Sequence, residues 1–195
     1  MKAALALALL LPCLALAAAP AVETRTWPID PAQSLAQFSV RKFWFAHERG
    51  TFPSMHGSLR GIDTRAGVDL AEVEATLDVA DLQMDDADDR EHALGGNFFD
   101  AARFPVVRFD SDPFPLADLA GGGNLHGLLT LHGERHPVAF ALLPSDCPRQ
   151  PLECMIRLRG TISRSLFGMR MWRGVLSDKV ELDLRIRLAP QAAED

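Results

Sequence analysis

The sequence of 195 residues predicts an all-β fold of about eight antiparallel strands, arranged as a closed barrel or as a sandwich of two sheets. Apolar and polar residues alternate along much of the chain, which gives each strand one dry face and one wet face. Thirteen prolines and 14 glycines interrupt the chain, as expected for many short elements. Helical and strand segments do not alternate regularly, so a parallel α/β sheet is not expected.

Strands are expected wherever the alternation is regular. The final segment is the clearest, because the apolar residues from Val180 to Leu188 alternate with charged ones. A turn at Gly133–Glu134 joins two other segments into a hairpin. The expected strands are Ala36–Val40, Met55–Gly61, Val73–Val79, Val106–Asp110, Leu125–His132, Pro137–Leu143, Ile156–Ile162 and Val180–Leu188.

One short helix is expected, over Asp85–Leu94. Aspartates crowd its first turn, where the positive end of the helix dipole stabilises negative charge. The Gly121–Gly123 run is typical of a loop before the hairpin. No linker, repeat or shift in composition divides the chain, so residues 20–195 are expected to form one domain.

The first 19 residues have the pattern of a secretory signal peptide. Lys2 is followed by an apolar run from Ala3 to Leu16, and small residues then lead up to Ala19. The alternative is a retained membrane anchor. A membrane-spanning helix needs about 20 apolar residues, whereas this run is shorter and contains Pro12. Cleavage and export are therefore the expectation.

Charge restricts the partners. Lys and Arg number 20 and Asp and Glu number 26, so the net charge is −6. This sign disfavours nucleic acid and anionic membrane surfaces as bulk partners. Tyrosine is absent from the sequence, so no phenol is available for acid–base chemistry.

Cys147 and Cys154 are the two cysteines that remain after cleavage, since Cys13 lies in the signal segment. In an exported chain, two cysteines across a Pro-rich turn predict one disulfide. Closing so short a loop stabilises the fold by about 2.5 kcal/mol in the chain-entropy model. A redox-active pair is the alternative, but the spacing is not C-x-x-C.

No constellation for catalysis or for a metal is predicted. His132 and His136 flank a turn, so they do not share a helical face as a zinc-protease pair does. The carboxylates between Asp85 and Glu91 lack the glycine and the distal glutamate of a calcium loop. The sequence contains no G-x-S-x-G elbow, G-x-G-x-x-G or P-loop. Neither a cofactor nor an enzymatic activity is expected.

Several short motifs occur in a defined order from Trp27 to Leu188. They are Trp27-Pro-Ile-Asp30 with Ser34, Phe38-Ser-Val40, Gly50-Thr-Phe52, Asp89-Arg-Glu-His-Ala-Leu94, Asn97-Phe-Phe-Asp100, Phe104-Pro105 running into Phe109, Gly127–Gly133, His136-Pro-Val138, Ser163–Met169 and Ser177-Asp-Lys-Val180. Together they resemble the YceI-like family of exported lipocalin-like proteins.

The resemblance implies an eight-stranded antiparallel lipocalin-like barrel whose interior forms a long apolar pocket. Members of the family hold a polyisoprenoid chain, such as a prenylated quinone, and are usually periplasmic. Two positions depart from the family pattern. Gln33 and Lys42 stand where histidines are common, which affects the environment expected for a ligand head group.

Strand parity and the resemblance together predict the ligand-binding residues. Lys42 and Arg90 are expected to meet a polar head group, and Trp44 and Trp172 to lie at the rim. The expected apolar lining is Phe38, Val40, Phe45, Phe52, Leu77, Phe98, Phe99, Phe109, Phe140, Leu158, Ile162, Phe167, Met169 and Leu184.

The expected function is carriage or sequestration of an apolar isoprenoid or similar lipid in the periplasm, without catalysis. Expected partners are this ligand and a membrane or membrane protein that donates it, and a homodimer is left open. Two alternative functions are also considered. One is an isomerase or cyclase in which Lys42 works with a buried acid. The other is a filled-core interaction module that serves membrane electron transfer.

Overall fold

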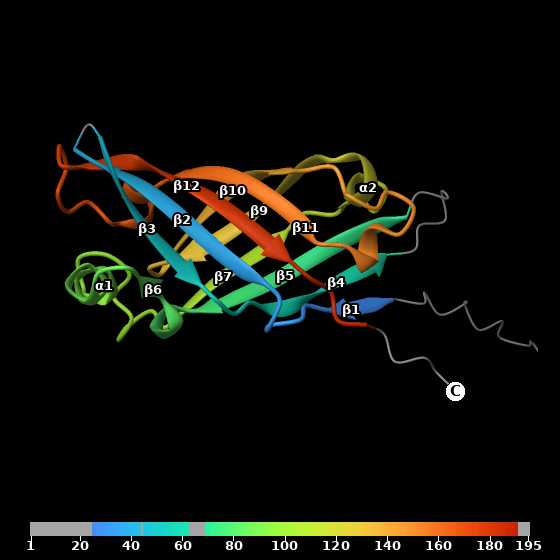
Figure 1. Cartoon of the computed structure of the whole chain (residues 1–195), viewed down its shortest axis with the longest axis horizontal. Coiled ribbons are helices and arrows are strands. Elements are labelled where there is room, and N and C mark those ends of the chain that lie inside the picture. Colours follow the sequence, from blue (N-terminus) through green and yellow to red (C-terminus); the bar gives the residue numbers. More distant parts are fainter. Residues whose placement is uncertain (1–24, 44, 63–68, 191–195) are drawn as a thin grey trace, which may run out of the picture.

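The computed structural model describes residues 25–43, 45–62 and 69–190, so the predicted signal segment lies outside the described residues. One antiparallel sheet curls into a barrel (Figure 1). Its strands are β1 (Thr26–Pro28), β2 (Leu35–Lys42), β3 (Ala46–Phe52), β4 (His56–Ile62), β5 (Leu70–Asp78), β6 (Gln83–Met84), β7 (Val106–Ser111), β8 (Phe114–Pro115), β9 (Gly123–Leu131), β10 (Glu134–Leu142), β11 (Ile156–Ser163) and β12 (Leu176–Ile186).

The strand order is β1-β4-β5-β7-β9-β10-β11-β12-β2-β3-β6, with β8 paired to β5. At one end the chain after β1 meets the chain after β12, where Ile29 bridges Leu188. At the other end β5 continues through a 3-10 turn into β6, which pairs with β3 through Gly50 and Met84. The seam between the outer strands of the sheet is thus closed at two points by short contacts rather than by a full ladder of hydrogen bonds.

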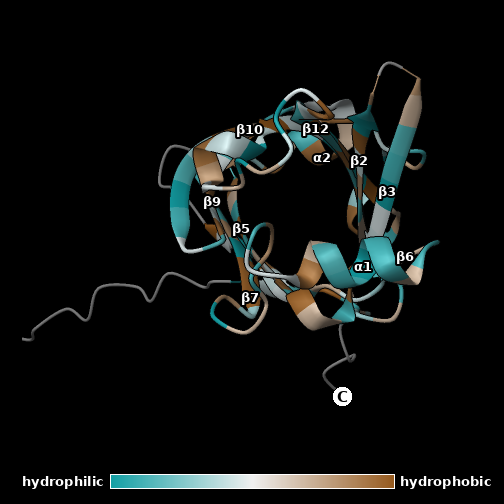
Figure 2. Ribbon diagram, turned by 90° about the vertical axis from the view of Figure 1, so that its left-hand side faces the viewer, coloured by the Kyte–Doolittle hydropathy of each residue, from teal (hydrophilic) through white to brown (hydrophobic). Residues whose placement is uncertain are grey.

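Two α-helices and three 3-10 turns accompany the strands. The helices are α1 (Ala87–Leu94) and α2 (Asp118–Gly121), and the turns are η1 (Val79–Asp81), η2 (Pro151–Glu153) and η3 (Arg164–Phe167). The Asp86 side chain caps α1 by accepting from the N–H groups of Asp88 and Asp89. Figure 2 looks along the barrel from the end that carries α1. The two helices lie at opposite ends of the barrel (Figure 1).

The all-β antiparallel prediction is confirmed, and each expected strand lies within or overlaps an observed one. The strand count was too low, because the alternation did not reveal β1, β3, β6 and β8. The expected helix corresponds to α1, but the four-residue helix α2 was not predicted. Its last residue, Gly121, is the first residue of the glycine run that is expected to form a loop.

Alternation decides which side chains face inward. On β9, Leu125, Leu129 and Leu131 are buried, while His126 is exposed. On β12 the inward positions Val180, Leu182 and Leu184 are only half-buried. They pack against the core, yet a part of each surface faces open space inside the barrel. The interior is therefore incompletely filled.

Candidate functional site

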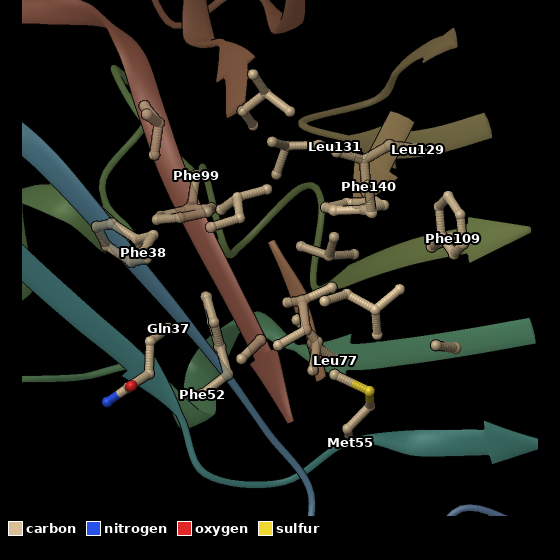
Figure 3. A pocket seen from close by; sticks show the side chains of 18 of the residues that line it. Gln37, Phe38, Phe52, Met55, Leu77, Phe99, Phe109, Leu129, Leu131 and Phe140 are labelled. Atoms are coloured by element: carbon tan, nitrogen blue, oxygen red, sulfur yellow. The ribbon is translucent and has the colours of Figure 1, made fainter. Parts of the chain in front are cut away.

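The barrel encloses an apolar cavity of about 200 Å³. Its walls come from β2, β3, β4, β5, β7, β9, β10, β11 and β12, and they are almost entirely hydrocarbon. In Figure 3, Phe52, Leu77, Leu129 and Phe140 surround a shared space. A dry cavity of about 150 Å³ already holds a benzene molecule. This interior therefore accepts an apolar group larger than one ring.

Aromatic rings define the width of the cavity. Phe38, Phe52 and Phe99 form one cluster, with ring centroids 5.7–6.3 Å apart. Phe109 and Phe140 meet edge to face, with centroids 5.3 Å apart. Such tilted arrangements are the ones that the charge distribution of aromatic rings favours. The rings give the cavity firm walls.

Glycines opposite the rings make room for them. Gly160 of β11 pairs with Phe140 of β10, and a Cβ atom at this glycine would lie 2.6 Å from a carbon of the Phe140 ring. Gly50 of β3 pairs with Phe38 of β2, and a Cβ there would collide with the Phe38 ring. The rings can therefore lie flat against the wall, which leaves the centre of the barrel free.

Burial differs between the two ends of the cavity. At the end with β1 and α2, the lining residues Ile29, Met55, Phe114 and Leu119 are between 3% and 5% exposed. At the end with α1, Trp172 lines the cavity and is 39% exposed. The first end is a sealed floor, and the second is the mouth.

Charged groups line the cavity at the mouth. The Lys42 Nζ atom lies 2.7 Å from Glu48 Oε1 and 3.7 Å from Asp89 Oδ1. The hydrogen bond to Glu48, the charges of both carboxylates and the hydrogen bond to Asp89 outweigh desolvation, and the pKa of Lys42 is raised. The amine therefore stays protonated at neutral pH.

A buried arginine supports the rim of the mouth. Arg164, 3% exposed, donates from Nη1 to the carbonyl oxygens of Met169 and Met171, each at 2.7 Å. Its Nε and Nη2 atoms donate to the carbonyls of Ser177 and Leu176. Burial lowers the pKa of its guanidinium. One side chain thus fixes both ends of the segment between η3 and β12.

That segment carries Trp172 to the mouth. The backbone of Trp172 is left-handed, with φ at 56°. The indole ring packs against Phe98 and His92, with centroids 5.8 and 5.9 Å away. Trp172 therefore reaches from the rim segment to the α1 side of the opening.

Most of the residues predicted to bind a ligand lie around this one cavity. They are Phe38, Val40, Lys42, Phe52, Leu77, Phe98, Phe99, Phe109, Phe140, Leu158, Ile162, Met169 and Leu184. Trp172 lines it as well, whereas Trp44 lies outside the described residues.

Three predicted positions do not line the cavity. Phe45 is 83% exposed, because the turn between β2 and β3, with φ at 55° for Phe43, interrupts the strand parity. The Arg90 side chain is occupied with backbone, donating to the carbonyls of Leu82 and Ala80. Phe167 is buried in the core beside His136, with ring centroids 5.2 Å apart, and does not reach the cavity.

Sequence reasoning missed the polar partners and the floor. Glu48 and Asp89 line the mouth, and Leu119 of α2 closes the opposite end. Glu48 stands at an inward position of β3, which parity would identify once that strand is recognised. No local pattern marks Leu119, because α2 is only one turn long.

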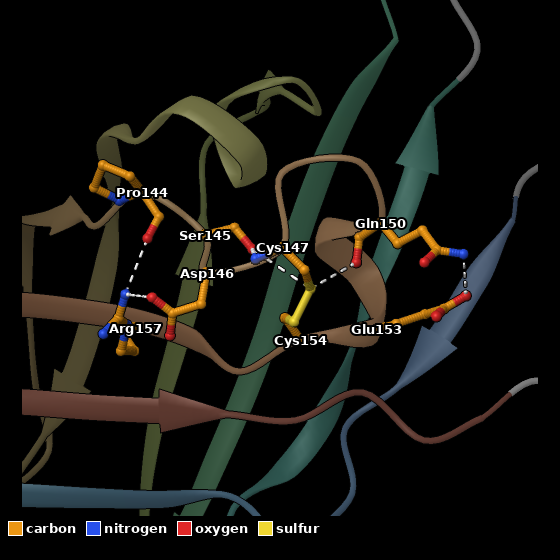
Figure 4. Close-up of a disulfide and its surroundings, with 8 residues drawn as sticks. All are labelled: Pro144, Ser145, Asp146, Cys147, Gln150, Glu153, Cys154 and Arg157. Carbon is orange, nitrogen blue, oxygen red and sulfur yellow. Dashed lines mark hydrogen bonds and ion pairs between the residues drawn. A yellow bond between two sulfur atoms is a disulfide. The ribbon is translucent and has the colours of Figure 1, made fainter.

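The predicted disulfide is present between Cys147 and Cys154, with a Cα–Cα distance of 6.2 Å (Figure 4). It closes the loop between β10 and β11 on the floor side. In the same loop Ser145 donates its N–H to the carbonyl of Ala120, which belongs to α2. Arg157 holds the loop by donating to the carbonyl of Pro144 and to Asp146. The loop is therefore connected to the helix that seals the cavity.

Two further features concern only the described ranges. No group of three or more His, Cys, Asp or Glu side chains within them is placed to hold a metal ion. No helix found there is long and apolar enough to cross a bilayer.

The fold and the cavity define the class: an antiparallel β-barrel with an apolar interior that opens at one end. Comparison with known proteins agrees with this class. The model of the YceI-like domain matches residues 27–188, and the chain therefore belongs to the YceI-like family. A comparison with curated protein sequences gave no match.

Solved structures share the fold at low sequence identity. BcnA of Burkholderia cenocepacia is 22% identical, with 83% of this chain and 99% of BcnA covered and a TM-score of 0.63. A polyisoprenoid-binding domain from Saccharophagus degradans is 18% identical, with 82% and 95% covered and a TM-score of 0.54. The YceI protein of Campylobacter jejuni is 18% identical, with 77% and 90% covered and a TM-score of 0.60.

Proposed function

We propose that this protein binds an apolar isoprenoid, such as a prenylated quinone or a related lipid, inside its barrel. Its role is to carry or sequester this ligand in the periplasm without changing it chemically. The observation that carries the proposal is the hydrocarbon-lined cavity with a floor at one end and a mouth at the other. The description of the S. degradans relative as polyisoprenoid-binding supports the same ligand class.

The energetics favour a long apolar chain. Each methylene-sized group that leaves water for the cavity contributes about 0.8 kcal/mol. The lining offers few directional contacts, so binding depends on apolar area and tolerates different chain lengths. The charged groups lie at the mouth, where Lys42, Glu48 and Asp89 can meet a polar head group while the tail extends toward the floor.

The alternatives have less support. An enzyme using Lys42 as a base requires a lowered pKa for this amine, but the pKa is raised by its two carboxylate partners. A filled-core interaction module requires side chains to occupy the interior, whereas the interior contains a cavity of about 200 Å³. Periplasmic export remains a proposal that rests on the pattern of residues 1–19.

The proposal is tested by purifying the exported protein without detergent, extracting it with organic solvent and analysing the extract by mass spectrometry. We expect an isoprenoid or a related lipid in stoichiometric amount. In Phe140→Asp the retained lipid should disappear while the far-UV circular dichroism spectrum persists, because a carboxylate then faces the cavity. An empty extract together with no uptake of an apolar fluorescent probe would refute the proposal.

A further inference from the structure

Large exposed apolar side chains gather at the mouth of the barrel. Phe43 and Phe45 lie in the turn between β2 and β3, and they are 51% and 83% exposed. Leu166 of η3, and Met171 and Trp172 in the segment that follows, are between 39% and 55% exposed. Both segments lie at the end of the barrel that carries α1 (Figure 1).

The two segments are physically joined. The Phe43 N–H donates to the carbonyl of Val175 at 2.6 Å. Lys42, at the end of β2, pairs with Leu176, at the start of β12. The exposed apolar side chains therefore belong to one connected rim rather than to independent loops.

Positive charge accompanies these side chains. Arg41, Arg170 and Arg173 are exposed, and no carboxylate in the described ranges lies within ion-pair distance of them. Three carboxylates lie nearby: Asp178 accepts from the Ser165 N–H, and Glu48 and Asp89 are paired with Lys42. We use the name collar for the three arginines together with Phe43, Phe45, Leu166, Met171 and Trp172.

The part of the mouth formed by α1 has the opposite charge. Asp85, Asp86, Asp88, Asp89 and Glu91 lie in or next to α1. The whole chain is acidic, with a net charge of −6, whereas the three arginines of the collar have no carboxylate partner among the described residues and Arg170 donates to the carbonyl of Ser165. An apolar edge with basic residues beside it is the composition that proteins use to rest on anionic lipid surfaces.

We propose that the collar docks on a bilayer that contains anionic phospholipid, with the mouth of the barrel turned toward the acyl chains. This inference rests on the proposed function, because docking serves to exchange the apolar ligand with the membrane. The apolar side chains enter the interfacial layer, and the arginines meet lipid phosphates. The carboxylates near α1 are repelled from the same surface, so the docked barrel tilts toward its β2–β3 side.

Trp172 places the collar next to the cavity. It belongs to the exposed rim and also lines the interior, beside Phe98. A ligand that leaves the bilayer at this point remains in contact with apolar groups until it reaches the cavity. Docking through the collar therefore shortens the exposure of the lipid to water.

The test measures co-sedimentation of the full exported chain with vesicles of phosphatidylcholine, and with vesicles of equal parts phosphatidylcholine and phosphatidylglycerol. The F43N/F45S variant removes two side chains that do not line the cavity, and asparagine tolerates the left-handed backbone at position 43. Each lost phenylalanine should weaken binding to the anionic vesicles by roughly tenfold.

A second variant tests the charges. In R170S/R173S each lost arginine should weaken binding to the anionic vesicles by about fivefold, and vesicles of pure phosphatidylcholine should show little difference. R60S/R159S is the matched control, because it removes the same charge from outer faces away from the mouth. Val106→Ser controls for exposed apolar area on the opposite wall, since Val106 of β7 is 49% exposed. Both controls should bind as the wild type does.

The outcomes separate this inference from the proposed function. Collar variants should still take up an apolar fluorescent probe in solution, whereas Phe140→Asp should lose the probe and still bind vesicles. Equal vesicle binding by the wild type and the collar variants would overturn the inference. It would also be overturned if the collar substitutions changed only the self-association of the protein in size-exclusion chromatography. If the protein binds vesicles through the collar but takes up neither probe nor lipid, the docking inference is supported and the proposed function is refuted.

Discussion

The contact between Gly160 and Phe140 allows the cavity to be narrowed by one methyl group. In Gly160→Ala the new Cβ would lie 2.6 and 2.9 Å from two carbons of the Phe140 ring. Carbon atoms in ordinary contact are about 3.5–4.0 Å apart, so the ring must shift by roughly 1 Å. Phe140 lines the cavity, and the ring therefore moves into the space that a ligand would occupy.

The expected cost to the empty protein is small. Overpacking a core costs about 1–3 kcal/mol, and a ring with a cavity beside it should be at the low end of this range. For a chain of this size, about 1 kcal/mol lowers Tm by about 2–4 °C. Uptake of an apolar fluorescent probe should weaken by about tenfold, because the displaced ring removes room and contacts from the bound state.

Gly61→Ala is a matched control outside the cavity. Its Cβ would approach the Trp27 ring at 3.1 Å, and neither residue lines the pocket. This variant should lower Tm similarly and leave probe uptake unchanged. In a Phe140→Leu background, Gly160→Ala should alter uptake by less than about twofold, since the ring that transmits the effect is gone. A fall in Tm with unchanged uptake in Gly160→Ala would refute the assignment of Phe140 to the binding cavity.

Three further predictions concern the floor and the mouth. Cys147→Ser/Cys154→Ser should lose about 2.5 kcal/mol of unfolding free energy in urea denaturation, and an unchanged midpoint would show that the disulfide does not stabilise the fold. The pKa of Lys42 is raised above its ordinary value of 10.5, so its ion pairs stabilise the fold below that pH and lose this contribution as the pH rises through the folded-state pKa. Thermal scans should therefore show a decline in Tm above about pH 10.5 that is weaker in Lys42→Met; identical profiles would contradict this. Arg164→Met should lower stability by about 2 kcal/mol or more and speed amide hydrogen exchange between Met169 and Leu176, because buried carbonyls lose their donors. Unchanged exchange there would mean that other contacts hold the rim.

The sequence predicted the long strands with regular alternation, and it missed the two- or three-residue strands β1, β6 and β8 together with the longer β3. On β3 the inward positions include Glu48 and Gly50, so the dry face does not read as apolar. Glu48 is tolerated there because Lys42 faces it across the hairpin, and Gly50 because the Phe38 ring covers it. Both exceptions are three-dimensional, and a one-dimensional alternation cannot show them.

The lining residues within regular strands were predicted correctly, whereas the predictions for residues after a strand end were wrong. Phe140 and Leu184 lie within long regular strands, and parity placed them on the lining. Phe45 and Phe167 follow strand ends, where a turn or a 3-10 segment replaces the strand and its alternation no longer applies. Arg90 was misassigned because its partners are backbone carbonyls, which carry no sequence signal.

The arrangement of one sealed floor and one open mouth has a kinetic consequence. Within the part of the chain that the structure describes, a ligand bound as proposed would enter and leave past the same residues, with Trp172 beside the opening. Microscopic reversibility then requires that an obstacle confined to this passage slow loading and unloading by the same factor. A change at the mouth that only hinders passage would alter how long the barrel takes to reach equilibrium, and the fraction of filled barrels at equilibrium would stay the same.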